Sequence, residues 1–81
     1  MRPVERVPEV VIRKIPMLHC EPYLRKQLVV DGVVIREQIT EFGNGDVAFA
    51  FEQYAKNHPE AAVSQWVIDE VIKRLGLPPL V

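Results

Sequence analysis

The fold is decided by the segment YLRKQLVVDGVVIREQITEF, residues 23–42, which has the pattern of a complete β-hairpin. Asp31-Gly32 at its centre is the preferred dipeptide of a two-residue type I′ turn, and valine, leucine and isoleucine flank it on both sides. With Asp31 and Gly32 as the loop, the sequence predicts a regular ladder. Its pairs are Val30 with Val33, Val29 with Val34, Leu28 with Ile35, Gln27 with Arg36, Lys26 with Glu37, Arg25 with Gln38 and Leu24 with Ile39.

This register predicts one apolar and one polar face, because side chains alternate between the two faces of a strand. The apolar face includes the opposite-charge pair of Lys26 and Glu37 and otherwise consists of Leu24, Leu28, Val30, Val33, Ile35 and Ile39. The polar face includes Val29 and Val34 near the turn and otherwise consists of Tyr23, Arg25, Gln27, Arg36, Gln38 and Thr40. We expect the apolar face to pack on the core and the polar face to point away from it.

A further strand is predicted over residues 9–15, EVVIRKI, where β-branched residues are frequent. Pro16 cannot donate to a β-ladder, so this strand ends there or lies at the edge of a sheet. After the Gly43-Asn44-Gly45 break, Asp46 is a favoured N-cap residue for a helix over residues 46–57. The apolar face of this helix consists of Val47, Phe51, Tyr54 and Ala55.

A second helix is predicted over residues 59–75, with Pro59 in its first turn and Gly76 as its stop. Its apolar stripe consists of Val63, Val67, Val71 and Leu75, widened by Trp66, Ile68 and Ile72. So wide a stripe predicts contact with the sheet and, in addition, with the first helix or a neighbouring chain.

These elements predict a single-domain α+β fold, a small two-layer βββαα sandwich. In it, one strand and one hairpin form a three-stranded antiparallel sheet that two C-terminal helices cover on one face. A chain of 81 residues has no room for a second core. The predicted segments are an arm over 1–8, a strand over 9–15, the hairpin over 23–42, helices over 46–57 and 59–75, and a tail over 76–81.

The composition is that of an ordinary soluble globular protein, with 48% hydrophobic and 26% charged residues. Ten Lys and Arg against eleven Asp and Glu provide no global field that would attract nucleic acid or an anionic membrane. The apolar runs are too short for a membrane span, and the N-terminal residues lack the apolar core of a secretory signal. Because one cysteine forms no internal disulfide, we expect a reducing cytoplasm as the compartment.

The most reactive-looking cluster lies in IPMLHCEPY, residues 15–23, where His19 and Cys20 are adjacent. A zinc site needs three or four protein ligands, and the chain offers one Cys and two His without a metal-binding spacing. We therefore predict no catalytic residue, no metal ligand and no cofactor. The segment is interpreted as a connector in which Met17, Leu18 and Cys20 fill the core, while His19 and Glu21 face solvent.

The candidate interaction surface is the polar face of the hairpin, with Phe49 added from the side of the first helix opposite its core stripe. Arginine and glutamine can bind phosphates or base edges and tyrosine can stack on a base, whereas exposed apolar side chains favour a protein partner. A solvated sheet face with no partner is the third interpretation. The candidate residues are Tyr23, Arg25, Gln27, Val29, Val34, Arg36, Gln38 and Phe49.

We expect a non-enzymatic interaction or regulatory module that binds another protein, of a size that suits an accessory protein of an operon or mobile element. A homodimer is expected, because so small a domain gains buried surface by self-association. The alternative is a nucleic-acid-binding protein that uses Arg13, Arg25, Arg36 and Tyr23. Neither a membrane nor a small-molecule substrate is predicted as a partner.

Overall fold

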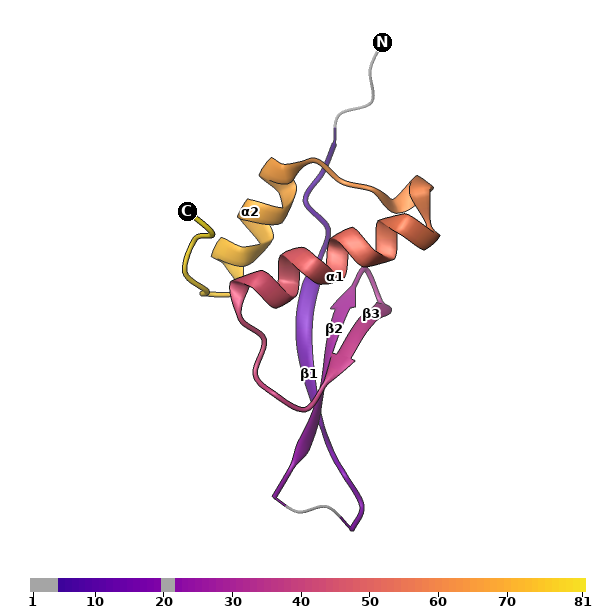
Figure 1. Cartoon of the computed structure of the whole chain (residues 1–81), viewed down its shortest axis with the longest axis vertical. Coiled ribbons are helices and arrows are strands. Elements are labelled where there is room, and N and C mark those ends of the chain that lie inside the picture. The colour runs from indigo at the N-terminus through magenta and orange to yellow at the C-terminus, as the bar shows by residue number, and fades with distance from the viewer. Residues whose placement is uncertain (1–4, 20–21) are drawn as a thin grey trace.

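The computed structural model describes residues 5–19 and 22–81 and has the predicted βββαα architecture. The three strands form one antiparallel sheet in the order β1-β2-β3, and helix α1 crosses this sheet with α2 beside it (Figure 1). The elements are β1 (Val10–Pro16), β2 (Leu24–Val30), β3 (Val33–Gln38), α1 (Asn44–Asn57), the 3₁₀ turn η1 (Pro59–Ala61) and α2 (Gln65–Arg74). The small α+β fold is therefore confirmed.

The turn between β2 and β3 has the predicted type I′ conformation. Asp31 has φ 48° and Gly32 has φ 82°, and this turn requires positive values at both positions. The turn is also tied to the start of β1, because the Asp31 amide donates to the Glu9 carbonyl and the Asp31 carboxylate accepts from the Glu9 amide. As expected from Pro16, β1 ends at this residue and lies at an edge of the sheet.

The predicted register of the hairpin is wrong beyond its first two pairs. Val30 pairs with Val33 and Val29 with Val34 as expected, but Leu28 then pairs with Arg36. The register shift leaves Ile35 as an extra residue in β3, a β-bulge. The remaining pairs are Gln27 with Glu37 and Lys26 with Gln38, so the predicted pair of Lys26 and Glu37 does not form.

The bulge changes the face on which the end of β3 lies, because a shift of one residue exchanges the two faces of a strand. Arg36 and Gln38 now share the face of Leu28 and Lys26, which is the face toward the helices. Ile35 remains packed against the core in spite of the shift. The core itself consists of Leu28, Phe42, Val47, Ala50, Phe51, Val67, Ile68, Val71 and Ile72.

Helix α1 begins two residues before the predicted position. Its N-cap is Gly43, and Asp46 is the third helical residue, so the prediction of Asp46 as the N-cap is wrong. The Asp46 carboxylate instead reaches back and accepts the Gly43 amide at 2.8 Å. This contact satisfies an amide at the start of the helix and places an acidic side chain in its first turn, where the helix dipole favours one.

The predicted second helix is divided into η1 and α2, with an extended link between them. Ala62 has φ −65° and ψ 138°, and Ser64 is the N-cap of α2. The link packs Val63 against the core and lets Ser64 donate from both its amide and its hydroxyl to the Glu5 carboxylate. These two contacts explain why the helix begins at residue 65.

The stop at Gly76 is confirmed. Gly76 has φ 77°, its amide donates to the Lys73 carbonyl, and the Leu77 amide donates to the Ile72 carbonyl. These bonds form the Schellman motif that glycine favours at a helix end. The tail beyond it folds back, because the Asn44 side-chain amide donates to the carbonyls of Pro78 and Pro79.

The connector between β1 and β2 lies at the end of the sheet that extends beyond the helices (Figure 1). Leu18 is 85% exposed, so the prediction that it fills the core is wrong. Met17 is half-buried and His19 is exposed, as the solvent-facing prediction required. The predictions for Cys20 and Glu21 fall outside the described residues.

Candidate interaction surfaces

The structure distributes the predicted site residues over two faces of the sheet and one helix. Arg25, Gln27, Val29 and Val34 lie on the face away from the core, whereas Arg36 and Gln38 lie on the face toward the helices. Phe49 is 45% exposed on α1, and Tyr23 is 60% exposed just before β2. The predicted surface of alternating arginine and glutamine therefore does not exist, because the bulge removes two of its members.

The face away from the core is hereafter called the open face. Residues that pair between β1 and β2 and between β2 and β3 lie side by side, so the side chains of this face form rows across the sheet. None of its members belongs to the core cluster. The open face consists of Val11, Arg13, Ile15, Arg25, Gln27, Val29, Val34 and Glu37.

The first row of the open face is apolar and is hereafter called the valine row. It consists of Val11 on β1, Val29 on β2 and Val34 on β3, which lie side by side in the register. Val11 is 45% exposed and Val34 is 39% exposed, whereas Val29 between them is only 5% exposed. Val29 was predicted as exposed but is buried, so the two outer valines supply the free apolar surface of this row. Val11 is the member of this row that the sequence prediction missed.

The second row of the open face is polar and carries both signs of charge. It consists of Arg13, Gln27 and Glu37, again one residue from each strand. Gln27 Nε2 donates to Glu37 Oε1 at 2.8 Å, and the guanidinium of Arg25 lies 3.6 Å from the same oxygen. Arg13 is exposed, and within residues 5–19 and 22–81 it forms no ion pair. Within the described part of the chain, Glu37 therefore has an arginine as a partner, whereas Arg13 has no carboxylate partner.

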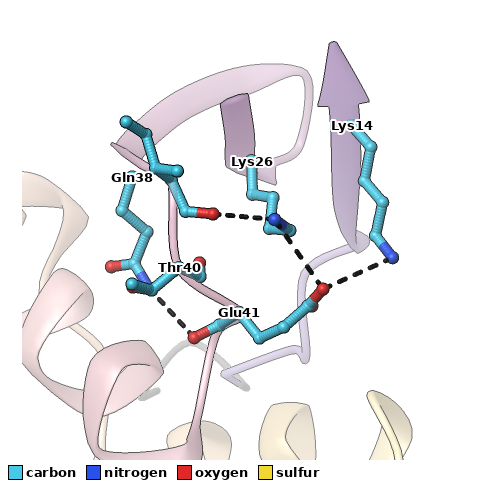
Figure 2. Close-up of polar contacts among 6 residues, drawn as sticks. Lys14, Lys26, Gln38, Thr40 and Glu41 are labelled. Atoms are coloured by element: carbon cyan, nitrogen blue, oxygen red, sulfur yellow. Dashed lines mark hydrogen bonds and ion pairs between the residues drawn. The ribbon is translucent and has the colours of Figure 1, made fainter. Parts of the chain in front are cut away.

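On the opposite face, Lys26 is almost fully buried and holds the loop that follows β3 (Figure 2). Its ammonium donates to the Ile39 carbonyl at 2.7 Å and lies 3.7 Å from Glu41 Oε1. The same carboxylate oxygen lies 3.8 Å from Lys14 Nζ. A buried ammonium requires such partners, and the backbone carbonyl is the closest of them.

Gln38 extends this network along the loop. Its Nε2 lies 3.2 Å from each of three acceptors, the Thr40 carbonyl, the Thr40 hydroxyl and the Glu41 carbonyl. Figure 2 shows Gln38 beside this loop, joined to Glu41 by a dashed line. Gln38 Oε1 accepts from Arg36 Nε at 2.9 Å, and the Arg36 guanidinium lies over the ring of Phe49. Arg36, Gln38 and Phe49 thus contact one another or the loop, which gives them an architectural role.

A cleft of about 290 Å³ separates the tip of the hairpin from the link before α2. Its polar lining includes Glu60 and the ion pair of Arg6 and Asp31, which are 2.8 Å apart. Its volume is at the lower limit of ordinary ligand pockets. Its apolar lining includes Pro8, Val30, Val33, Ile35, Phe51 and Val63. These residues come from separate segments, so no local sequence pattern indicates the cleft.

Among the described residues, the contacts of the His58 side chain are a ring stack and a nearby carboxylate. His58 stacks on Tyr54 with ring centres 4.2 Å apart, and its Nδ1 lies 3.5 Å from a Glu60 carboxylate oxygen. Within residues 5–19 and 22–81 no three His, Cys, Asp or Glu side chains gather to hold a metal ion.

No family model, curated protein or solved structure matches this chain. In the described part of the chain, no helix is both long and apolar enough to span a bilayer.

Proposed function

We propose that this chain is a small non-enzymatic module that binds another protein through the open face. The observation that carries the proposal is the valine row, an apolar strip that crosses all three strands on the face that the core does not use. Burying the free parts of Val11 and Val34 contributes roughly 1 kcal/mol each. A row of arginine, glutamine and glutamate borders this strip, as polar residues border the apolar centre of many interfaces.

A protein partner fits this surface better than a nucleic acid does. A phosphate-binding surface needs a concentration of unpaired cations, but Glu37 is 3.6 Å from Arg25 and hydrogen-bonded to Gln27. Arg36, which the nucleic-acid hypothesis required on the same face, lies on the helix side. We further propose a reducing cytoplasm as the compartment, because the chain has one cysteine.

The proposal is tested with a photoreactive phenylalanine analogue at position 34 on the open face, and in a matched protein at position 52, an exposed site on α1. On irradiation we expect a discrete covalent adduct between position 34 and the bound protein, and no adduct from position 52. Val11→Lys, which places a charge in the valine row, should abolish the adduct. Equal adducts from the two positions, or an adduct that Val11→Lys leaves unchanged, would contradict the proposal.

A further inference from the structure

We propose that the partner on the open face is a second copy of this chain, stacked face to face about a two-fold axis that runs along β2. This inference rests on the proposed function and names its partner. The rows of the open face are self-complementary under this rotation, in apolar contact and in charge.

The geometry follows from the strand order. Rotation by half a turn about an axis along the central strand places β1 of each copy over β3 of the other and keeps every row at its own level. In the valine row, Val11 then lies against Val34 of the second copy, and Val29 lies against Val29. The two exposed valines of the valine row in each copy cover those of the other copy.

In the second row the same rotation pairs opposite charges. Arg13 on β1 lies over Glu37 on β3 of the second copy, and symmetry repeats this contact. Arg13 is the open-face arginine without an ion pair in the described part of its own chain. The second copy supplies the carboxylate that it lacks, and complementary charge of this kind fixes the orientation of two partners.

The other simple two-fold arrangement has its axis across the strands, and it is less complementary. It stacks each strand on its own copy. With the axis through the polar row, Arg13 faces Arg13 and Glu37 faces Glu37, which juxtaposes like charges. With the axis through the valine row, Val11 faces Val11 and Arg13 faces Glu9 of the second copy, but Glu37 faces the hairpin turn and gains no arginine.

Arg25 is compatible with the proposed arrangement. It lies two rows beyond the valine row, about 13 Å along the strand. Stacked sheets cross at about 30°, so their ends diverge, and Arg25 is placed at the solvated rim with its own Glu37 as a partner.

The size of the face predicts a weak dimer. Three strands about 4.8 Å apart and the two contacting rows, about 7 Å apart, give a footprint of roughly 200 Å² per copy. This is well below the roughly 800 Å² per partner of a standard stable interface. We therefore expect a dissociation constant in the range of about 10 to 100 µM, as in transient complexes.

The experiment uses charge reversal in two variants, Arg13→Glu and Glu37→Arg, studied by analytical ultracentrifugation up to several hundred micromolar. The wild type should dimerise in that range. In a dimer of either variant alone, residues 13 and 37 carry the same charge in both symmetry-related contacts. Each variant alone should therefore dimerise at least tenfold more weakly than the wild type. In an equimolar mixture both contacts become complementary, so a heterodimer should form. Arg74→Glu, on the exposed side of α2, is the matched control and should dimerise like the wild type.

A second measurement keeps the inference testable if a charge variant folds poorly. In a Cys20→Ser background, the double variant Val11→Cys/Val34→Cys should form covalent dimers with a short thiol-to-thiol cross-linker that spans roughly 5 Å, the gap left between facing cysteine side chains of sheets stacked about 10 Å apart. Val11→Cys alone should form none, because the axis along β2 separates the two copies of this residue by the width of the sheet. Linkage by Val11→Cys alone would show the axis across the strands and overturn the arrangement.

A wild type that is monomeric throughout the concentration range would overturn this inference, as would a dimer whose charge variants fail to recombine. The proposed function is judged separately. If the wild type is monomeric but position 34 still forms an adduct that Val11→Lys abolishes, the open face binds a different protein and only the self-association is wrong.

Discussion

The guanidinium carbon of Arg36 lies 5.1 Å from the centre of the Phe49 ring, so the end of β3 packs against α1. Arg36 Nε also donates to Gln38 Oε1 at 2.9 Å. Both contacts exist because the bulge at Ile35 turns this part of β3 toward the helix. Arg36, which the alternation of the hairpin predicts on the exposed polar face, thus connects the sheet to the helical layer.

Arg36→Ala should lower the free energy of unfolding by about 1 kcal/mol, because it removes a half-buried cation–π contact and one hydrogen bond. Urea denaturation followed by far-ultraviolet circular dichroism measures this change. Arg25→Ala is the matched control, since its ion pair with Glu37 on the open face is exposed and is expected to contribute less than about 0.5 kcal/mol. Equal losses for the two variants would show that the contact with Phe49 adds nothing.

The turn at Asp31-Gly32 is specified by its own two residues, whereas the bulge at Ile35 depends on residues far along the chain. Asp31-Gly32 specifies its turn locally, because both residues tolerate the positive φ that the turn requires. The bulge has no such signal, since VVIREQ alternates acceptably with or without an extra residue. It is stabilised by contacts of Ile35 with the core and of Arg36 with Phe49, and the helix that completes them lies later in the sequence.

The error in the candidate site follows from that one residue. Because side chains alternate with a period of two, the slip moved Arg36 and Gln38 to the helix side. The position of Val11 on the open face was missed for a related reason. Which side chains of β1 lie on that face depends on how β1 pairs with β2, and the connector between these strands has no turn signature that would fix the pairing. The break before α2 was missed because its cause is Glu5, 59 residues before Ser64.

Lys26 should contribute strongly to stability although it is charged. Lys26→Met removes the donor to the Ile39 carbonyl and the partner of Glu41 in a nearly buried site. We expect a loss of about 1 to 3 kcal/mol in the free energy of unfolding. Hydrogen exchange should also quicken in residues 38–42, the loop that Lys26 holds.

Lys14→Met provides the control for Lys26, because Lys14 lies 3.8 Å from the same carboxylate but is exposed. An exposed ion pair of this kind contributes less than about 0.5 kcal/mol. If the two variants lose similar amounts of unfolding free energy, the hydrogen bond from Lys26 to the Ile39 carbonyl contributes nothing beyond an exposed ion pair.

Two glycines should respond in opposite directions to the same substitution. Gly32→Ala should cost about 1 kcal/mol, because φ 82° is unfavourable for a residue with a Cβ even though nothing lies within 4 Å of it. Gly45→Ala also meets open space but lies in the first turn of α1, where alanine should stabilise the helix by about 0.5 kcal/mol. Thermal unfolding measures both, and a stabilising Gly32→Ala would contradict the type I′ turn.

The contact between Glu5 and Ser64 should make stability depend on pH. Hydrogen bonds from the Ser64 hydroxyl and then from its amide lower the pKa of the Glu5 carboxyl below its ordinary value. The native state therefore binds fewer protons than the unfolded state in this range. A group with a lowered native pKa stabilises the fold at neutral pH and loses that contribution as the pH falls through its pKa.

Wild type should accordingly be more stable than Glu5→Gln at pH 7, and the difference should shrink as the pH falls from about 5 to 3, the range of an ordinary glutamate pKa and below. Urea denaturation of both proteins at several pH values measures the difference directly, so that the titration of all other groups cancels. Ser64→Ala should weaken the dependence, because it removes the hydroxyl and leaves the amide as the remaining donor from Ser64. If wild type and Glu5→Gln differ by the same amount at pH 3 as at pH 7, the carboxylate does not join the start of α2 to the N-terminal segment in solution.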